Sequence, residues 1–251
     1  MTKIYYFSGT GNSLWSARAI AGAIGGEHAL INIGAEAGGV VEADAVVLVF
    51  PSYAFGLPLA VRRFATNTEF RTPYLAAFTT YGSTPGGTLA ALWRILKRKN
   101  IGSVFLGRIP AVENYIAIFG PPKEKTERRR LEMQSRATME AARQVTERRV
   151  NRVNGFRPVS ALIWLLFSLG AGIFYKRYRV SDDCNGCGIC EKLCPVSNIS
   201  MRDGRPVFSA GCEHCQGCLN WCPRKAIHFG RLNSRVARYH HPEISLRDIS
   251  R

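Results

Sequence analysis

The sequence predicts an α/β protein: a doubly wound, five-stranded parallel sheet, followed by a helical linker and a small α+β domain. Three observations predict this organisation. Strand-like and helix-like segments alternate over the first part of the chain. An apolar segment without charged side chains, residues 158–175, separates this part from the rest of the chain. All eight cysteines lie beyond it, between Cys184 and Cys222. A length of 251 residues fits two domains of ordinary size.

The elements of the first domain follow from hydrophobic periodicity and from the glycine and proline residues between them. The valine-rich run Asp44–Phe50 indicates a strand that is buried on both faces. Alternation of strands with helices favours a parallel sheet covered by helices on both sides. In chain order we expect strand 3–7, helix 13–25, strand 28–33, strand 44–50, helix 58–66, strand 74–80, helix 87–99 and strand 103–109.

The cysteines form two copies of one pattern, C-x2-C-x2-C-x3-C-P, ending at Pro195 and Pro223. This run is typical of [4Fe–4S] cluster ligation. Zinc sites favour separated C-x2-C pairs, and disulfides need an oxidising compartment, whereas the first thirteen residues show no signal peptide. The pattern therefore predicts two [4Fe–4S] clusters and a cytoplasmic protein. The predicted ligands are Cys184, Cys187, Cys190, Cys194, Cys212, Cys215, Cys218 and Cys222.

On these runs, residues 180 to about 232 resemble a bacterial two-cluster ferredoxin. In that family the fourth cysteine of each run ligates the other cluster. The resemblance implies that one cluster takes Cys184, Cys187, Cys190 and Cys222, and that the other takes Cys212, Cys215, Cys218 and Cys194. Exposed clusters of low potential also suggest an anaerobic or microaerobic cell.

A short polar loop, Ser8-Gly9-Thr10-Gly11-Asn12-Ser13, joins the first strand to the first helix. At a helix N-terminus, free N–H groups and the helix dipole favour a phosphate. A plain helix-capping turn is the alternative. No Gly-Lys-Ser/Thr follows, and the G-x-G-x-x-G spacing is absent, so the loop is neither a Walker loop nor a dinucleotide fingerprint.

This loop is similar to the phosphate loop of flavodoxins, with Ser13 in place of the usual threonine. Two later loops, 51–58 and 81–87, also follow strands, where open α/β sheets bind ligands. The resemblance covers about residues 1–150 and implies bound FMN, with Tyr53, Phe55 and Tyr81 as candidates for stacking. Asn114 and Tyr115 either border the same pocket or simply pack. The candidate FMN contacts are Ser8, Gly9, Thr10, Gly11, Asn12, Ser13, Pro51, Ser52, Tyr53, Ala54, Phe55, Gly56, Thr80, Tyr81, Gly82, Gly87, Asn114 and Tyr115.

The whole arrangement resembles the EFR1-type ferredoxins, whose N-terminal region is similar to flavodoxins. The expected organisation is a flavodoxin-like domain over 1–150, an apolar linker helix over 151–179, a ferredoxin domain over 180–235 and a basic C-terminal tail over 236–251. We expect this tail to lie on the surface.

Residues 121–157 read as a long, arginine-rich helix after Pro121-Pro122, with Glu124/Arg128 and Glu132/Arg136 at helical spacing. A charged surface helix is the expectation, and a docking face for an acidic protein or an anionic membrane is the alternative. The formal charge of +16 departs from the usual acidity of flavodoxins. For residues 158–175 we expect a helix buried between the domains. A membrane span and an interfacial or docking helix remain open.

These features predict an electron-transfer protein that relays electrons between FMN and two clusters, converting two-electron into one-electron chemistry. A flavin-dependent reductase of a small organic substrate, with Tyr81 or Tyr115 as proton donor, is the second hypothesis. A redox-sensing nucleic-acid-binding protein is the third, without a supporting motif. The expected partners are redox proteins, some of them acidic. Nucleic acid is not expected, and membrane-surface contact is not favoured.

Overall fold

The computed structural model describes all residues except 37, 121, 152–157, 231–235 and 251. Its main sheet has five parallel strands in the order β2-β1-β4-β6-β7. Counting only these strands, the order is 2-1-3-4-5, which is that of the flavodoxin-like doubly wound fold. The predicted fold class is therefore confirmed. The strands are β1 (Thr2–Tyr6), β2 (His28–Asn32), β4 (Ala45–Pro51), β6 (Tyr74–Tyr81) and β7 (Ser103–Pro110).

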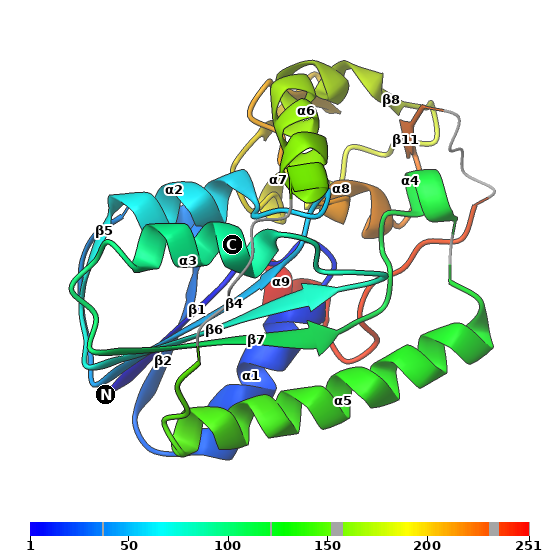
Figure 1. Ribbon diagram of the computed structural model, residues 1–251. Helices are drawn as coiled ribbons and strands as arrows, with labels where there is room; N and C mark the ends of the chain where they lie inside the picture. Colours follow the sequence, from blue (N-terminus) through cyan, green and yellow to red (C-terminus); the bar gives the residue numbers. More distant parts are fainter. Residues whose placement is uncertain (37, 121, 152–157, 231–235, 251) are drawn as a thin grey trace.

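Helices cover both faces of this sheet (Figure 1). Helices α2 (Leu59–Asn67) and α3 (Thr88–Leu96) lie on one face, and α1 (Asn12–Ile24) and α5 (Glu124–Thr146) lie on the other. Strand β4 shows why the sheet forms, because its residues alternate between the two cores. Val46, Leu48 and Phe50 pack under α2 and α3, whereas Val47 and Val49 pack on the α1 and α5 side.

Four small elements of the first domain were not expected from the sequence. Strands β3 (Gly39–Glu42) and β5 (Thr68–Arg71) pair in parallel beside the main sheet. They are short, and only Val41 and Phe70 reach the core, so their periodicity was too brief to detect. The others are the 3-10 turn η1 (Ile33–Ala35) and helix α4 (Ile116–Phe119).

The cysteine-rich part is an α+β unit of two small antiparallel pairs and two single-turn helices. Strand β8 (Tyr178–Val180) pairs with β11 (Ile227–Phe229), and β9 (Ile199–Arg202) pairs with β10 (Arg205–Phe208). Helices α7 (Ile189–Lys192) and α8 (Gly217–Asn220) carry the third cysteine of each run, Cys190 and Cys218. This unit shares its core with the first domain, because Leu14 of α1 and Ile116 of α4 pack among Leu193, Leu219 and Trp221.

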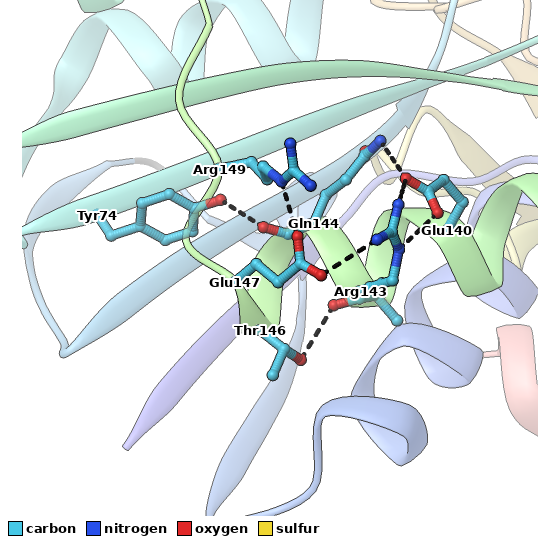
Figure 2. A network of polar contacts seen from close by, with 8 residues as sticks. Tyr74, Glu140, Arg143, Gln144, Thr146, Glu147 and Arg149 are labelled. Atoms are coloured by element: carbon cyan, nitrogen blue, oxygen red, sulfur yellow. Dashed lines mark hydrogen bonds and ion pairs between the residues drawn. The ribbon is translucent and has the colours of Figure 1, made fainter.

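Helix α5 is the charged surface helix that the sequence predicts. It buries Gln134, Thr138, Ala141, Ala142 and Val145, and its charged side chains pair along the outer face. Figure 2 shows the C-terminal end of this network, where Arg143 bridges Glu140 and Glu147. Exposed pairs of this kind add little to stability, so the helix depends mainly on its buried stripe. Pro121, Arg152 and Arg157 of the predicted basic segment lie outside the described residues.

The apolar linker forms α6 (Pro158–Phe174), continued by the turn η2 (Tyr175–Arg177). The expectation that this helix is buried between the domains is wrong for its outer face. Trp164, Phe167 and Phe174 point inward, but Leu166 and Leu169 remain 60% and 68% exposed. Among the described residues, no helix combines the length and apolar character needed to cross a bilayer.

The C-terminal tail does not lie loosely on the surface, which corrects the sequence expectation. Its last helix is α9 (Leu246–Ile249). Tyr239, His241, Ile244 and Ile249 are all buried. The backbone N–H of His241 donates to Thr10 O at 2.8 Å, and the ring stacks on Trp15 at 4.9 Å. The tail thus packs the cysteine-rich unit onto α1.

Protonation of His241 is expected to loosen this contact. Burial lowers the pKa of His241 from 6.5 to about 4. Below pH 6.5 His241 is protonated in the unfolded chain but stays neutral in the folded chain. The stability that this residue contributes is therefore fully present above pH 6.5 and is lost as pH falls towards 4. Between about pH 7 and pH 5 we expect a loss of about 1–2 kcal/mol in urea unfolding, absent in His241→Phe.

His28→Phe is the matched control, because His28 is exposed on β2 and should leave this pH dependence in place. An equal acid sensitivity in His241→Phe and in the unmodified protein would contradict the assignment.

Candidate functional site

A cavity of about 700 Å³ opens at the carboxyl ends of the parallel strands. It lies where four loops meet, those that follow β1, β4, β6 and β7, and we call it the sheet-edge cavity. Its volume is within the range of small-molecule and cofactor sites. Its position, outside the carboxyl edge of an open α/β sheet, is the usual place for a ligand in this fold.

Most of the residues that the sequence assigns to FMN line this cavity. Gly11, Gly56 and Gly87 do not, and Gly56 and Gly87 border a second cavity beneath α6. The sheet-edge cavity is lined by the assigned residues Ser8, Gly9, Thr10, Asn12, Ser13, Pro51, Ser52, Tyr53, Ala54, Phe55, Thr80, Tyr81, Gly82, Asn114 and Tyr115.

The N-terminus of α1 offers the donors that a phosphate needs. No side chain caps this helix, and its first turn contains no acidic residue. Within the described part of the chain, the backbone N–H groups of Asn12, Ser13 and Leu14 meet no acceptor. Buried N–H groups are rarely left unpaired. Neutral donors at the positive end of a helix dipole fit a bound phosphate.

The polar side chains of the loop mostly hold its shape. Asn12 donates from Nδ2 to Val112 O at 3.0 Å and accepts from the Tyr239 hydroxyl at 2.8 Å. Asn114 donates to Thr10 Oγ1 at 2.6 Å, and Ser13 and Thr80 share a hydroxyl hydrogen bond of 2.8 Å. The Asn12 amide therefore connects the loop to the segment after β7 and to the C-terminal tail.

The loop after β4 makes a strained hairpin. Tyr53 and Gly56 exchange backbone hydrogen bonds of 3.0 and 2.9 Å around Ala54 and Phe55. These two central residues have φ of 47° and 62°, the left-handed region that glycine and asparagine normally occupy in such turns. A residue other than glycine in this backbone conformation destabilises the fold by about 1–3 kcal/mol, and such residues cluster at binding sites. The strain presents Phe55 to the cavity.

Two tyrosines beside the cavity have raised pKa values. Burial is the largest cause at Tyr53, and the neighbouring Cys215 and Glu213 add to it, so its pKa lies well above 10. The Tyr53 hydroxyl is buried and has no hydrogen-bond partner among the described residues. Burial also raises the pKa of Tyr115 to about 12, which makes that hydroxyl a weak acid at neutral pH.

The far wall of the cavity was not found by sequence reasoning. It comes from α4, from the inner face of α6 and from the cysteine-rich unit, and neither periodicity nor a motif marks these residues. The sequence identifies the apolar segment 158–175. It does not show which side of this helix faces the protein, because the segment has no charged side. The additional lining residues include Ile118, Phe119, Phe167, Phe174, Arg177, His214, Phe229 and Gly230.

The eight cysteines are free thiols that line two further cavities. The inner cluster cavity, closest to the sheet, is lined by Cys194, Cys212, Cys215 and Cys218. The outer cluster cavity is lined by Cys184, Cys187, Cys190 and Cys222. Each cavity therefore draws three cysteines from one run and the fourth from the other. No group of three metal-binding side chains among the described residues is close enough to hold a single metal ion.

The chemistry of these cavities fits an iron–sulfur group. Backbone N–H groups point at the sulfurs, from Asn198 to Cys194 at 3.2 Å and from His214 to Cys212 at 3.4 Å. Burial raises the pKa of Cys190 to about 12 and that of Cys212 to about 11. Thiolates are thus costly there without a cation, and iron would supply the compensating charge.

The inner cluster cavity directly adjoins the phosphate-loop candidate. A Cβ placed on Gly9 would lie 2.5 Å from Cys215 O and 3.1 Å from its Sγ. Trp221 Nε1 donates to Gly9 O at 3.1 Å from the other side. Glycine is therefore required at position 9 by a close backbone approach between two ligand loops. The sheet-edge cavity and the inner cluster cavity have this contact as their common wall.

Comparison with known proteins agrees with this description of the cysteine-rich part. Residues 178–200 match the family model of the 4Fe-4S binding domain. The chain is 37% identical over 57 residues to Ferredoxin-2 of Chlorobaculum tepidum, covering 92% of that protein and 20% of this chain. Among solved structures, it is similar to the flavodoxin of Streptococcus pneumoniae TIGR4, at 13% identity and a TM-score of 0.38 over 58% of this chain and 97% of the other. It is also similar to the Megasphaera elsdenii flavodoxin, at 18% identity and a TM-score of 0.34 over 57% and 98%.

The strand order and the paired cysteine cavities define a protein in which a flavodoxin-like domain and a ferredoxin domain are fused. Through its C-terminal part, the chain belongs to the ferredoxin family.

The contact at Gly9 predicts a specific defect. Gly9→Ala drives a methyl group into the Cys215 backbone, and overpacking of this kind costs about 1–3 kcal/mol. We expect reduced flavin occupancy together with a changed EPR spectrum of one cluster, both measured on anaerobically purified protein.

Gly22→Ala is the control, because Gly22 lies in α1 and a methyl group added there would meet nothing within 4 Å. It should leave both signals unchanged and raise stability slightly, by about 0.5–1 kcal/mol. If Gly9→Ala behaves like Gly22→Ala, the two loops are not in contact.

Proposed function

We propose that this protein transfers electrons between FMN in the sheet-edge cavity and two [4Fe–4S] clusters on the same chain. The contact between Gly9 and Cys215 carries the proposal, because it joins the candidate phosphate loop to a cluster ligand without an intervening side chain. FMN exchanges one or two electrons and each cluster exchanges one, so the combination suits conversion between the two kinds of chemistry.

The residues of the chain divide the work of holding FMN. The unpaired N–H groups of Asn12, Ser13 and Leu14 would bind its phosphate. The strained turn at Ala54 and Phe55 and the side chain of Tyr81 would border its ring system. Walls from α6 and the ferredoxin domain would exclude water from the face that the flavodoxin-like loops leave open.

The positions of the two cluster cavities give the relay an order. The inner cluster adjoins Gly9, and its cavity is closed by the stacked rings of Tyr178 and Phe208, 4.9 Å apart. The outer cluster cavity includes Cys187, which is exposed to solvent. We therefore assign the outer cluster to exchange with a redox partner, and the inner cluster to exchange with the flavin.

A reductase is the second candidate, and one observation favours it. The sheet-edge cavity continues past the flavodoxin-like loops to Phe174, Phe229 and the exposed Arg177. This extension would accommodate a small apolar acceptor with an anionic group near the guanidinium. Reoxidation of the reduced flavin by such acceptors, weakened in Arg177→Ala, would favour this candidate over pure electron transfer. Membership of the EFR1-type ferredoxins fits both candidates.

The relay order is tested first by composition and proximity. Anaerobically purified protein should contain two clusters and one FMN per chain, by iron, sulfide and flavin analysis. On partial reduction, the EPR relaxation of the flavin radical should be accelerated by one nearby reduced cluster. A flavin radical that relaxes as it does in a cluster-free flavodoxin would refute the inner assignment.

Ligand variants separate the two clusters. Cys187→Ser alters the outer cluster, so it should slow electron entry from an external donor while leaving the relaxation effect intact. Cys215→Ser alters the inner cluster and should abolish both flavin reduction through the clusters and the relaxation effect. Flavin reduction that survives in Cys215→Ser at its original rate would show that electrons bypass this route.

A further inference from the structure

The outer face of α6 is an exposed aliphatic surface. Its five most exposed residues are each 56–70% exposed and follow one another at spacings of three and four: Val159, Leu162, Leu166, Leu169 and Ile173. Ile163 and Leu165 widen this surface on its two sides. At 100° per residue the exposed aliphatic side chains span about 160° of the helix circumference. We call these seven residues the α6 apolar face.

Nothing on the α6 apolar face can form a hydrogen bond through its side chain. The two serines of the helix, Ser160 and Ser168, lie off this face, and Ser168 Oγ donates to Trp164 O at 2.6 Å. The inner face is firmly held, because Trp164 Nε1 donates to Leu57 O at 2.8 Å and its ring lies against Gly56. The exposed face is thus a fixed feature of the surface.

The surroundings of the α6 apolar face are positively charged. Helices α2 and α3, which flank it beside the cavity beneath α6, contain no acidic residue. Arg62 of α2 lies 5.0 Å from the Trp164 ring, and Arg98, two residues beyond α3, lines the same cavity. Lys176, Arg177 and Arg179 follow the helix and are exposed. The carboxylate of Glu213, beside α2, is buried and paired with Arg63.

We propose that the α6 apolar face docks this protein on an anionic lipid bilayer. Helix α6 lies in the membrane interface with its aliphatic side chains among the acyl chains, and the surrounding arginines and lysines bind lipid phosphates. Its 17 residues extend over about 25 Å, which suits a helix lying flat.

A bilayer fits this surface better than a protein does. A second copy of the chain would bring another formal charge of +16 against the same basic surroundings. Protein interfaces also form about one hydrogen bond per 100–200 Å², and the α6 apolar face has no side chain to make one. A coiled-coil seam is narrower than the sector of about 160° seen here.

The proposal is tested by flotation of the full holoprotein with vesicles. We expect binding to phosphatidylcholine vesicles that contain phosphatidylglycerol, little binding to pure phosphatidylcholine, and weakening when salt rises from about 0.1 to 0.5 M. Leu166→Glu/Leu169→Glu should weaken binding at least about tenfold, because two apolar side chains that would enter the acyl chains become charged. Unchanged flavin and cluster absorbance will show that this variant is folded.

The control is Met133→Glu/Met139→Glu, which replaces two exposed apolar residues of α5 on the opposite side of the sheet. It should bind vesicles as the unmodified protein does, apart from the small effect of net charge. Equal binding to both kinds of vesicle, undiminished binding of the α6 variant, or a dimer in light scattering that the α6 variant dissociates would each overturn the proposal.

Discussion

The close approach of two backbones at Gly9 is the constraint on which the rest of the structure depends. Gly9 follows β1 and faces Cys215, and Gly217 approaches the same point so closely that a Cβ added to it would lie only 2.8 Å from Gly9 O. Side chains at these positions would separate the two domains by at least the width of a methyl group. The shared core around Leu14, Leu193 and Trp221 then closes around this contact and excludes water from it. The domains consequently behave as parts of one packed unit rather than as two domains on a flexible linker.

The short C-terminal tail holds the two domains together. Tyr239 connects both domains, because its backbone N–H donates to Asn220 Oδ1 and its hydroxyl donates to Asn12 Oδ1. His240 stacks on Trp221 at 3.9 Å, and Arg18 pairs with Asp248 at 2.7 Å. The same few residues thus fix the N-terminus of α1 and the helix that carries Cys218. Any movement of the cluster loop relative to the candidate phosphate loop has to break these contacts, of which the two hydrogen bonds of Tyr239 are buried.

Local patterns predicted the parts of the structure that depend on local physics. The alternation in β4 identified the sheet, and the spacing of the cysteines identified the ferredoxin part, because burial and ligation leave periodic marks in the sequence. Contacts between distant segments leave none. Phe229 and Arg177 border the sheet-edge cavity only because β8 and β11 are brought there by the fold. His241 looked like part of a basic tail, and its burial depends on Trp15 and Gly11, more than two hundred residues earlier.

Helix α6 joins the two surfaces of the molecule that matter most for function. Phe167 and Phe174 on its inner side line the sheet-edge cavity, and both rings lie about 6 Å from His214, beside the inner cluster ligands. Leu166 and Leu169 on its outer side face solvent. Packed interiors transmit displacement. A shift of α6 caused by a contact on its outer face would therefore also move the cavity wall on its inner face. A helix with only a structural role would be expected to bury its leucines and expose polar groups. Helix α6 instead exposes its leucines, which is the distribution expected if a bilayer covers its outer face. The sheet-edge cavity would then lie next to the bilayer surface.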